Sequence, residues 1–345
     1  MPYLQNFNLT LQIRWKKVLW EFGFMGNLAR HQNYNNINVN QIHPDDLEAA
    51  NAPGINRAKK ERLFLPWVAR AGITDQIRLM SPSRGISNYD AATFNTEKRF
   101  RNGLGWTIAY THTHWIDDIH FIGNADTFGN NYYPQTVFDL GAERANSASR
   151  LPHRVVAAPI CNLPFGDVRR FGKTWPKVLN AIAGGWQVST IETMQSGGYV
   201  GTVVNGGGAI KGVETFGHPL RPNLTGAPFP HAQQSTPVDG VTGLNCLNPD
   251  AFSVPDRFTL GNASRTLPGV RGPWLFDLDM LVAKNFYRTV SDKEWRAQLR
   301  AEVFSMTNTP QFALPNASVG SGSFGIVRGV CGGRPVMEFG VRITF

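Results

Sequence analysis

The last eleven residues of the chain, 335–345, alternate between apolar and polar side chains almost without a break. One row contains Met337, Phe339, Val341, Ile343 and Phe345, and the other contains Glu338, Gly340, Arg342 and Thr344. Because successive side chains of a β-strand point to opposite faces, this segment has one apolar face and one polar face. Such a strand, ending on a phenylalanine, is typical of the closing strand of an outer-membrane β-barrel, with lipid on one side and the lumen on the other. A strand of a soluble β-sandwich has the same pattern, so this segment alone leaves both folds open.

Composition restricts the choice without deciding it. The 345 residues are 42% hydrophobic and 17% charged, which excludes a disordered chain. No run approaches the roughly 18 apolar residues of a membrane helix, whereas a barrel needs none, because half of each barrel strand is polar. The net charge of +9 is spread along the chain without an RNA- or DNA-binding signature, so we expect no nucleic-acid partner. It fits anionic lipopolysaccharide or an anionic solute in a lumen equally well. The three cysteines (Cys161, Cys246 and Cys331) match no zinc spacing and allow at most one disulfide.

Period-two alternation predicts nine strands. Their ranges are Gln5–Arg14, Val18–Gly26, Tyr89–Lys98, Gly103–Thr113, Arg154–Leu163, Gly185–Val204, Trp274–Phe286, Trp295–Met306 and the terminal segment. The sixth is mixed in phase and interrupted by Gly197 and Gly198.

The connections between these strands are alternately shorter and longer. They span about 15–17, 27–88, 99–102, 114–153, 164–184, 205–273, 287–294 and 307–334. Compact soluble domains rarely have several loops beyond roughly 12–15 residues. Outer-membrane barrels do, because short periplasmic turns alternate with long extracellular loops. The connections therefore favour an all-β transmembrane antiparallel barrel.

Nine strands cannot close a bacterial barrel, which has an even number of strands. An open sheet would expose two unpaired edges in the bilayer, where each unsatisfied backbone group costs several kcal/mol. We therefore expect residues 1–345 to be the C-terminal part of a larger barrel, with the N-terminal strands absent. Residues 1–5 also lack the basic and apolar regions of a signal peptide.

Few residue groups suggest chemistry. His112 and His114, with Asp117, Asp118 and His120 nearby, could hold a metal, but a solvated loop start explains them better. The glycine run 206–208 lacks the lysine of a phosphate loop, and no nucleophile elbow or triad is evident. We expect no metal, no cofactor and no enzymatic activity.

The charges on the last strands before the terminal one are more informative. Arg296, Arg300 and Glu302 share one strand face, and Asp277 and Asp279 lie on the preceding strand. An arginine facing lipid at the midplane costs roughly 2–4 kcal/mol, so these five residues are predicted to face the lumen. Cross-strand salt bridges or contacts to a plug are the simpler interpretation, and a ligand path is the alternative.

A series of motifs resembles one family over nearly the whole chain. They include NFNLTLQ (Asn6–Gln12), FGFMGN (Phe22–Asn27), SNYDA (Ser87–Ala91), GWTIAYT (Gly105–Thr111), LPFG (Leu163–Gly166), GWQVS (Gly185–Ser189), LNPDAF (Leu247–Phe252), LPGVRGP (Leu267–Pro273), KNF (Lys284–Phe286), RAEVF (Arg300–Phe304) and NTPQF (Asn308–Phe312). In this order and spacing the chain resembles the C-terminal barrel of TonB-dependent outer-membrane receptors, specifically the Oar-like group.

The resemblance implies a 22-stranded barrel closed by an N-terminal plug and driven by the TonB complex, which would act through a plug that this sequence lacks. It implies uptake of a large ligand across the outer membrane of a Gram-negative bacterium. The implied partners are outer-membrane lipid, lipopolysaccharide and the barrel assembly machinery, whose signal would be Phe345, Ile343, Val341 and Phe339. The sequence names neither the ligand nor its binding residues. A secreted β-sandwich adhesin or carbohydrate-binding protein is the alternative function.

Overall fold

The computed structural model of the chain describes most of its length. The described residues are 1–33, 37–38, 41–55, 65, 70, 78–79, 83–118, 134–166, 169–206, 219–238, 241–290, 293–330, 332 and 334–344. The following description applies to these residues.

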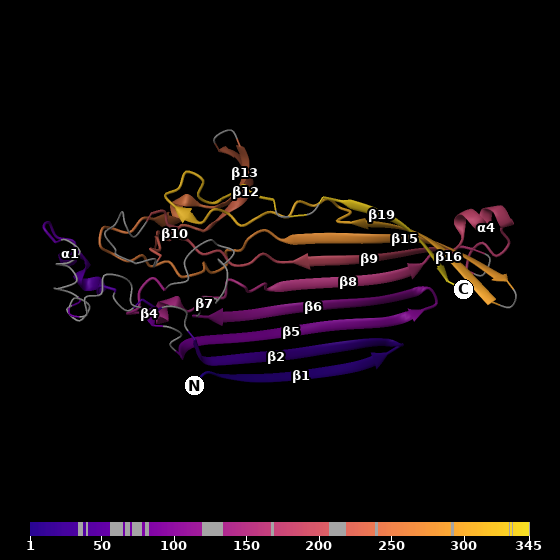
Figure 1. Cartoon of the computed structure of the whole chain (residues 1–345), viewed down its shortest axis with the longest axis horizontal. Coiled ribbons are helices and arrows are strands. Elements are labelled where there is room, and N and C mark those ends of the chain that lie inside the picture. Colours follow the sequence, from indigo (N-terminus) through magenta and orange to yellow (C-terminus); the bar gives the residue numbers. More distant parts are fainter. Residues whose placement is uncertain are drawn as a thin grey trace.

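Nine long strands form one antiparallel sheet, in the order in which they occur in the chain (Figure 1). They are β1 (Tyr3–Trp15), β2 (Val18–Asn33), β5 (Ser83–Arg101), β6 (Leu104–Asp117), β8 (His153–Asn162), β9 (Trp186–Gln195), β15 (Leu275–Val290), β16 (Lys293–Phe304) and β19 (Val336–Thr344). All nine predicted strands are confirmed. Each pairs with its neighbour along the chain, as in an up-and-down barrel wall.

One predicted strand is too long. The segment Gly185–Val204 was expected to be continuous, but β9 ends at Gln195, and Val203–Val204 form a separate short strand, β10. At Gly197 the backbone passes so close to Gly272 that an added Cβ would lie 2.1 Å from the Gly272 carbonyl oxygen. The chain therefore leaves the sheet here and packs against the far end of the same connection, just before β15, which the glycine pair permits.

The other elements are short and lie in the connections. The strands are β3 (Ile37–Asn38), β4 (Arg78–Leu79), β7 (Ala145–Asn146), β11 (Asn223–Leu224), β12 (Pro230–Val238), β13 (Val241–Leu247), β14 (Phe252–Ser253), β17 (Ser318–Val319) and β18 (Ile326–Val327). The helices are α1 (Leu47–Ala50), α4 (Lys177–Ala183) and three 3₁₀ turns, Pro44–Asp46, Gly141–Glu143 and Pro249–Ala251. No helix in the described part of the chain is long and apolar enough to cross a membrane.

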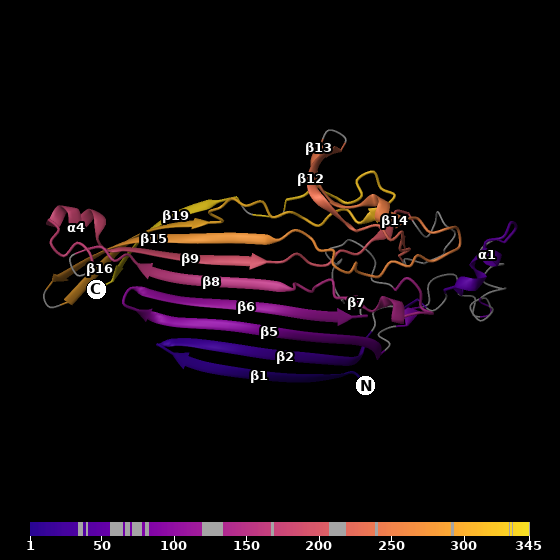
Figure 2. The ribbon, with the colours of Figure 1, turned by 180° about the vertical axis from the view of Figure 1, so that it is seen from behind.

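The two ends of the sheet differ. The strand ends that lead into the connections 34–82, 118–152, 196–274 and 305–335 lie together at one end of the sheet, with the described residues of these connections, and we call it the loop end (Figures 1 and 2). The turns 16–17 and 102–103 and the described residues of 163–185, including α4, lie at the other end, the turn end, where β15 ends and β16 begins. The N-terminus is at the loop end and the C-terminus at the turn end. This is the predicted separation of long loops from short turns.

The strand register gives the sheet one apolar face. Leu11 pairs with Phe22, and Phe22 pairs with Phe94 on the next strand, so their side chains share a face. At the other edge of the sheet the same face carries Leu299 opposite Val341. These side chains are exposed to a large extent, and the terminal row reaches 78% at Phe339.

No second sheet covers this apolar face among the described residues, since β7 pairs with the end of β6 in the same sheet and the other short strands form small sheets of two or three strands in the loops. A β-sandwich would bury such a face between two packed sheets. The sandwich alternative is therefore wrong, and the exposed apolar face is that of a barrel wall. The barrel is not closed within the described residues, because β1 and β19 each have one neighbour.

The hydrophobic core lies in the loops rather than in the sheet. One cluster is built around Val200, Leu247, Phe252 and Leu267, and residues of the 305–335 connection pack into it. A second is built around Ile42, Leu47, Val204 and Leu220. Both clusters join connections that are far apart in the sequence, and we call the resulting body the loop cluster.

Candidate functional site

The five predicted lumen residues share one face of the sheet. In the β15–β16 register Ala283 lies opposite Arg300, and Leu281 lies opposite Glu302. Asp277 and Asp279 have the same parity along β15 as these two partners, and Arg296 has the same parity along β16. They therefore lie on the face opposite Leu299 and Val341.

The contacts of these five residues differ from the simple cross-strand salt bridges considered for them. Asp277 accepts a hydrogen bond from the Ser305 hydroxyl (2.8 Å), and Asp279 accepts one from the Ser305 backbone N–H (2.9 Å). Arg300 forms an ion pair with Glu302, two positions along the same strand. The reason is the register: Met280 pairs with Val303, so Asp279 and Asp277 lie level with the end of β16, beyond the arginines.

Arg296 belongs to a cluster of amides that sequence reasoning did not single out. Its guanidinium donates to the Asn285 side-chain oxygen (2.8 and 3.1 Å). Gln298 donates to the same oxygen (2.9 Å) and to Gln187 on β9 (3.4 Å). Asn285 could have been found from the sequence, because it continues the alternation of Asp277 and Asp279. A similar row crosses β1, β2 and β5, where Gln12 and Asn95 both donate to Glu21 (2.6 and 2.8 Å).

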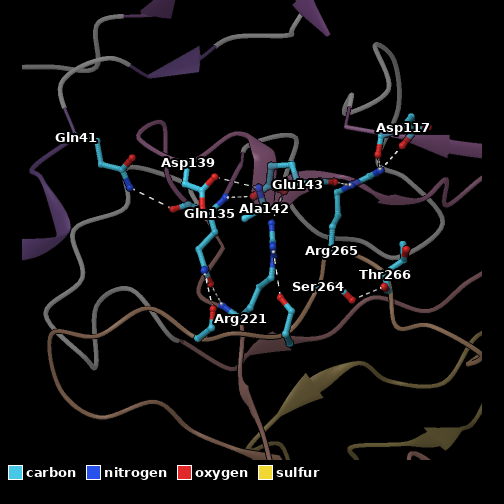
Figure 3. Close-up of polar contacts among 12 residues, drawn as sticks. Gln41, Asp117, Gln135, Asp139, Ala142, Glu143, Arg221, Ser264, Arg265 and Thr266 are labelled. Atoms are coloured by element: carbon cyan, nitrogen blue, oxygen red, sulfur yellow. Dashed lines mark hydrogen bonds and ion pairs between the residues drawn. The ribbon is translucent and has the colours of Figure 1, made fainter. Parts of the chain in front are cut away.

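The loop cluster contains a buried ion pair between Glu143 and Arg221 (Figure 3). The Glu143 side chain is 0% exposed and that of Arg221 is 4%. Glu143 also accepts from the backbone N–H of Gln135 (3.0 Å), and Gln135 in turn accepts from the Arg221 backbone N–H (2.6 Å). Gln41, from the first long connection, accepts from the Val137 N–H (2.8 Å). Three connections are thus joined by one buried polar network.

A second ion pair fixes this network to the sheet. Arg265 pairs with Asp117, the last residue of β6, and donates to the Asp117 carbonyl oxygen (2.8 Å). The same guanidinium donates to the Glu143 carbonyl oxygen (3.0 Å). Beside it, Asp118 accepts a hydrogen bond from the Ile86 N–H (2.6 Å). Burial, the largest effect, raises the pKa of Asp118, while that hydrogen bond opposes the rise.

No sequence pattern predicted this network. Glu143 lies in the connection 118–152, Arg221 and Arg265 lie in 196–274, and Asp117 ends β6; the sequence named Asp117 only beside the histidines, and no motif links these residues. Only the folding of the loops against one another brings them together.

The strand geometry separates the residues considered as metal ligands, because they do not all lie on one face of β6. His112 lies opposite Ala92 and Asp117 lies opposite Ser87, so the two are on opposite faces of β6. His153 of β8 contacts His112 instead, with their Nδ1 atoms 3.4 Å apart. His120 lies outside the described residues. In the described part of the chain no group of three or more His, Cys, Asp or Glu side chains is arranged to hold a metal ion.

The predicted assembly signal lies mostly on β19. Phe339, Val341 and Ile343 are all strongly exposed and share the apolar face of this edge strand. Phe345 lies outside the described residues, as does Cys331, whereas Cys161 on β8 has a free thiol. The arrangement is that of a sheet with an apolar outer face, a polar inner face and a packed cluster of loops at one end.

A comparison with protein-family models agrees with this geometry: the model described as "Outer membrane beta barrel domain" matches residues 1–336. The chain belongs to this outer-membrane β-barrel domain family. A search of curated proteins found no match. The barrel domain resides in the outer membrane, where an exposed apolar face of a barrel strand contacts lipid.

Proposed function

We propose that this barrel domain is the C-terminal part of an outer-membrane receptor that takes up a large ligand with energy from the TonB complex. The loop cluster is the observation that carries the proposal. Described residues from its four long connections are joined by buried ion pairs and two apolar clusters into one packed body. An ordered surface on rigid strands suits ligand capture, because binding then costs little loop ordering. The Oar-like motifs of the sequence support the same proposal.

In this proposal the sheet is one section of a wider barrel. Its two edge strands, β1 and β19, must each pair with a further strand, since an open edge in the bilayer leaves backbone groups unsatisfied at several kcal/mol each. A 22-stranded wall with an N-terminal plug would supply these partners. Asp277, Asp279, Arg296, Arg300 and Glu302 would then face the plug or the passing ligand. Lipopolysaccharide would surround the loop end.

The test compares two deletion strains of the source bacterium, one lacking this protein and one lacking TonB. Growth is measured on a panel of single nutrients offered at limiting concentration. We expect both strains to fail on the same nutrient, because uptake needs the receptor and its energy source together. Wild-type receptor should restore growth, and a receptor lacking residues 118–152 should not, although it reaches the outer membrane. A growth defect that is the same with and without TonB would contradict the proposal.

We also propose that the terminal row acts as a barrel assembly signal read by the assembly machinery. Removing Phe345 should reduce the amount of heat-modifiable barrel in the outer membrane and leave the mRNA level unchanged. The matched control is Thr344→Ala, which alters the neighbouring polar position and should assemble normally. Equal amounts of barrel with and without Phe345 would refute this role.

A further inference from the structure

The turn end of the sheet contains a strongly basic pocket between two neighbouring hairpins, β1–β2 and β5–β6. The cavity has a volume of about 450 Å³. Six cationic side chains line it, Arg14, Lys16, Lys17, Lys98, Arg99 and Arg101, together with one carboxylate, Glu97. Within the described part of the chain none of the six forms an ion pair. Such a concentration of unpaired positive charge attracts an anion from outside the chain.

The turn that supplies two of these lysines is strained. Lys16 and Lys17 are the two loop residues between the paired Trp15 and Val18, with φ of 47° and 69°. A two-residue hairpin turn with positive φ at both positions prefers Asn-Gly, because an ordinary L-residue there brings its Cβ too close to the backbone.

The adjacent hairpin shows the unstrained solution. Its turn is Asn102–Gly103, with φ of 53° and 81°. Both turns require positive φ at their two central residues. The β5–β6 turn meets this requirement with Asn-Gly, whereas the β1–β2 turn has two lysines there, at a cost in stability. Backbone strain of this kind persists mainly at functional positions. We therefore attribute the two lysines to a role of their side chains, since the turn geometry does not favour them.

Two tryptophans place the pocket at the membrane surface. The Lys16 ammonium lies 4.6 Å above the ring of Trp15, and the Lys98 ammonium lies 4.9 Å above the ring of Trp106. Both rings are on the lipid face, in register with Val18 and Lys98 respectively. Tryptophans concentrate at the bilayer interface, and lysine stems reach from apolar surface to the headgroups. The pocket therefore lies at headgroup level, at the end of the short turns, which is periplasmic.

We propose that this pocket binds the phosphate of an anionic phospholipid of the periplasmic leaflet, such as phosphatidylglycerol or cardiolipin. Lipopolysaccharide occupies the opposite leaflet, and phospholipids supply the phosphates at this one. Lysine and arginine donors around a cavity of headgroup size neutralise a phosphate diester. Arg14 and Glu97 line the cavity from the polar face, whereas Lys16 and Lys98 connect it to the lipid face, where they lie over Trp15 and Trp106 and where the acyl chains would run. The proposal rests on the orientation of the barrel in the membrane and not on TonB-dependent uptake.

The deciding variant is Lys16→Asn/Lys17→Gly, which copies the neighbouring Asn102–Gly103 turn. It removes two cations and also relieves the backbone strain. We expect the preference for phosphatidylglycerol over phosphatidylcholine to fall about tenfold, while the thermal stability of the barrel stays equal or rises. A variant that merely misfolds would lower both, so the two readouts separate binding from folding. Arg144→Gln/Arg257→Gln in the loop cluster removes the same charge outside the pocket and serves as control.

The full-length protein is extracted from outer membranes into detergent containing both phospholipids in equal amounts, and retained lipids are counted by native mass spectrometry. Selective retention of phosphatidylglycerol by wild type and the control, but not by the lysine variant, supports the proposal. Equal retention of both lipids by wild type would overturn it. Millimolar inorganic phosphate is the second probe: if it displaces phosphatidylglycerol completely, the pocket is a free-phosphate site and the lipid assignment is wrong.

Discussion

The sheet and the loop cluster place their apolar side chains in opposite ways. Phe339 on β19 is 78% exposed, whereas Leu247 and Leu267 in the loop cluster are 0% exposed. Charged groups show the opposite distribution, because the most deeply buried ion pair among the described residues, Glu143–Arg221, is in the loops. The sheet thus has the side-chain distribution expected in lipid, and the loop cluster has the distribution expected in water.

This contrast follows from one physical effect in two surroundings. Apolar side chains avoid water, so on the sheet they face hydrocarbon, and in the loops they must face one another. The loops therefore need a core of their own, and the sheet does not. Four predictions test this difference, beginning with the largest expected effect.

Glu143→Ala should open the loop cluster and leave the sheet intact. It strands the buried Arg221 guanidinium, which costs about 3–5 kcal/mol when one partner of a buried pair is removed. Hydrogen–deuterium exchange should rise in peptides covering 134–146 and 219–225 and stay constant in β6. The double variant Glu143→Leu/Arg221→Met removes both charges and should be much milder. If the double variant exchanges as fast as Glu143→Ala, the loss of protection comes from disturbed packing and not from an unpaired Arg221.

Leu267→Ala should lower the free energy of opening of the loop cluster by about 2–5 kcal/mol, because it leaves a cavity in a packed core. Leu299→Ala makes the same change on the lipid face, where the side chain is 47% exposed and lipid fills the space. Exchange protection of the loops and the melting temperature of the barrel report the two effects. If both substitutions destabilise their regions by a similar amount, the loop cluster and the lipid face do not differ in the medium that surrounds their apolar side chains.

Ile108→Arg and Thr107→Arg introduce the same charge at neighbouring positions of β6, on opposite faces. On the lipid face the arginine should cost roughly 2–4 kcal/mol, and on the lumen face little. The fraction of heat-modifiable barrel in outer membranes should fall for Ile108→Arg alone. The reverse order would exchange the assigned faces of the sheet.

The smallest effect concerns pH at the junction of the two regions. Burial raises the pKa of Asp118, so the folded state binds this proton more tightly than the unfolded state. As the pH falls from above the raised pKa of folded Asp118 toward the ordinary carboxylate pKa, the folded junction becomes more stable. Above the raised pKa, the full energetic cost of burying the charged Asp118 carboxylate destabilises the junction. Asp118→Asn can still accept from the Ile86 N–H and should lose this pH dependence. Exchange of residues 86–87, corrected for intrinsic rates, between about pH 4 and 7 measures it; identical profiles would argue against a titrating Asp118.

The strands were predictable because their information is local. Alternation along β6, with Trp106, Ile108 and Tyr110 on one face, depends on the sequence of that strand alone. The prediction failed at Gly185–Val204, where a distant backbone, that of Gly272, decides where the strand ends. Asp277 and Asp279 were assigned to the same face as Arg296 and Arg300, but their contacts with Ser305 depend on register.

The sequence by itself determined the nine strands, their two faces and the separation of long loops from short turns. Each of these follows from period two and from the lengths of connections. The tertiary structure decided the rest: the ion pairs of Glu143 and Arg265, the cores of the loop cluster and the basic pocket of two hairpins. These depend on groups far apart in the chain, whose meeting is set by how loops and strands pack in three dimensions.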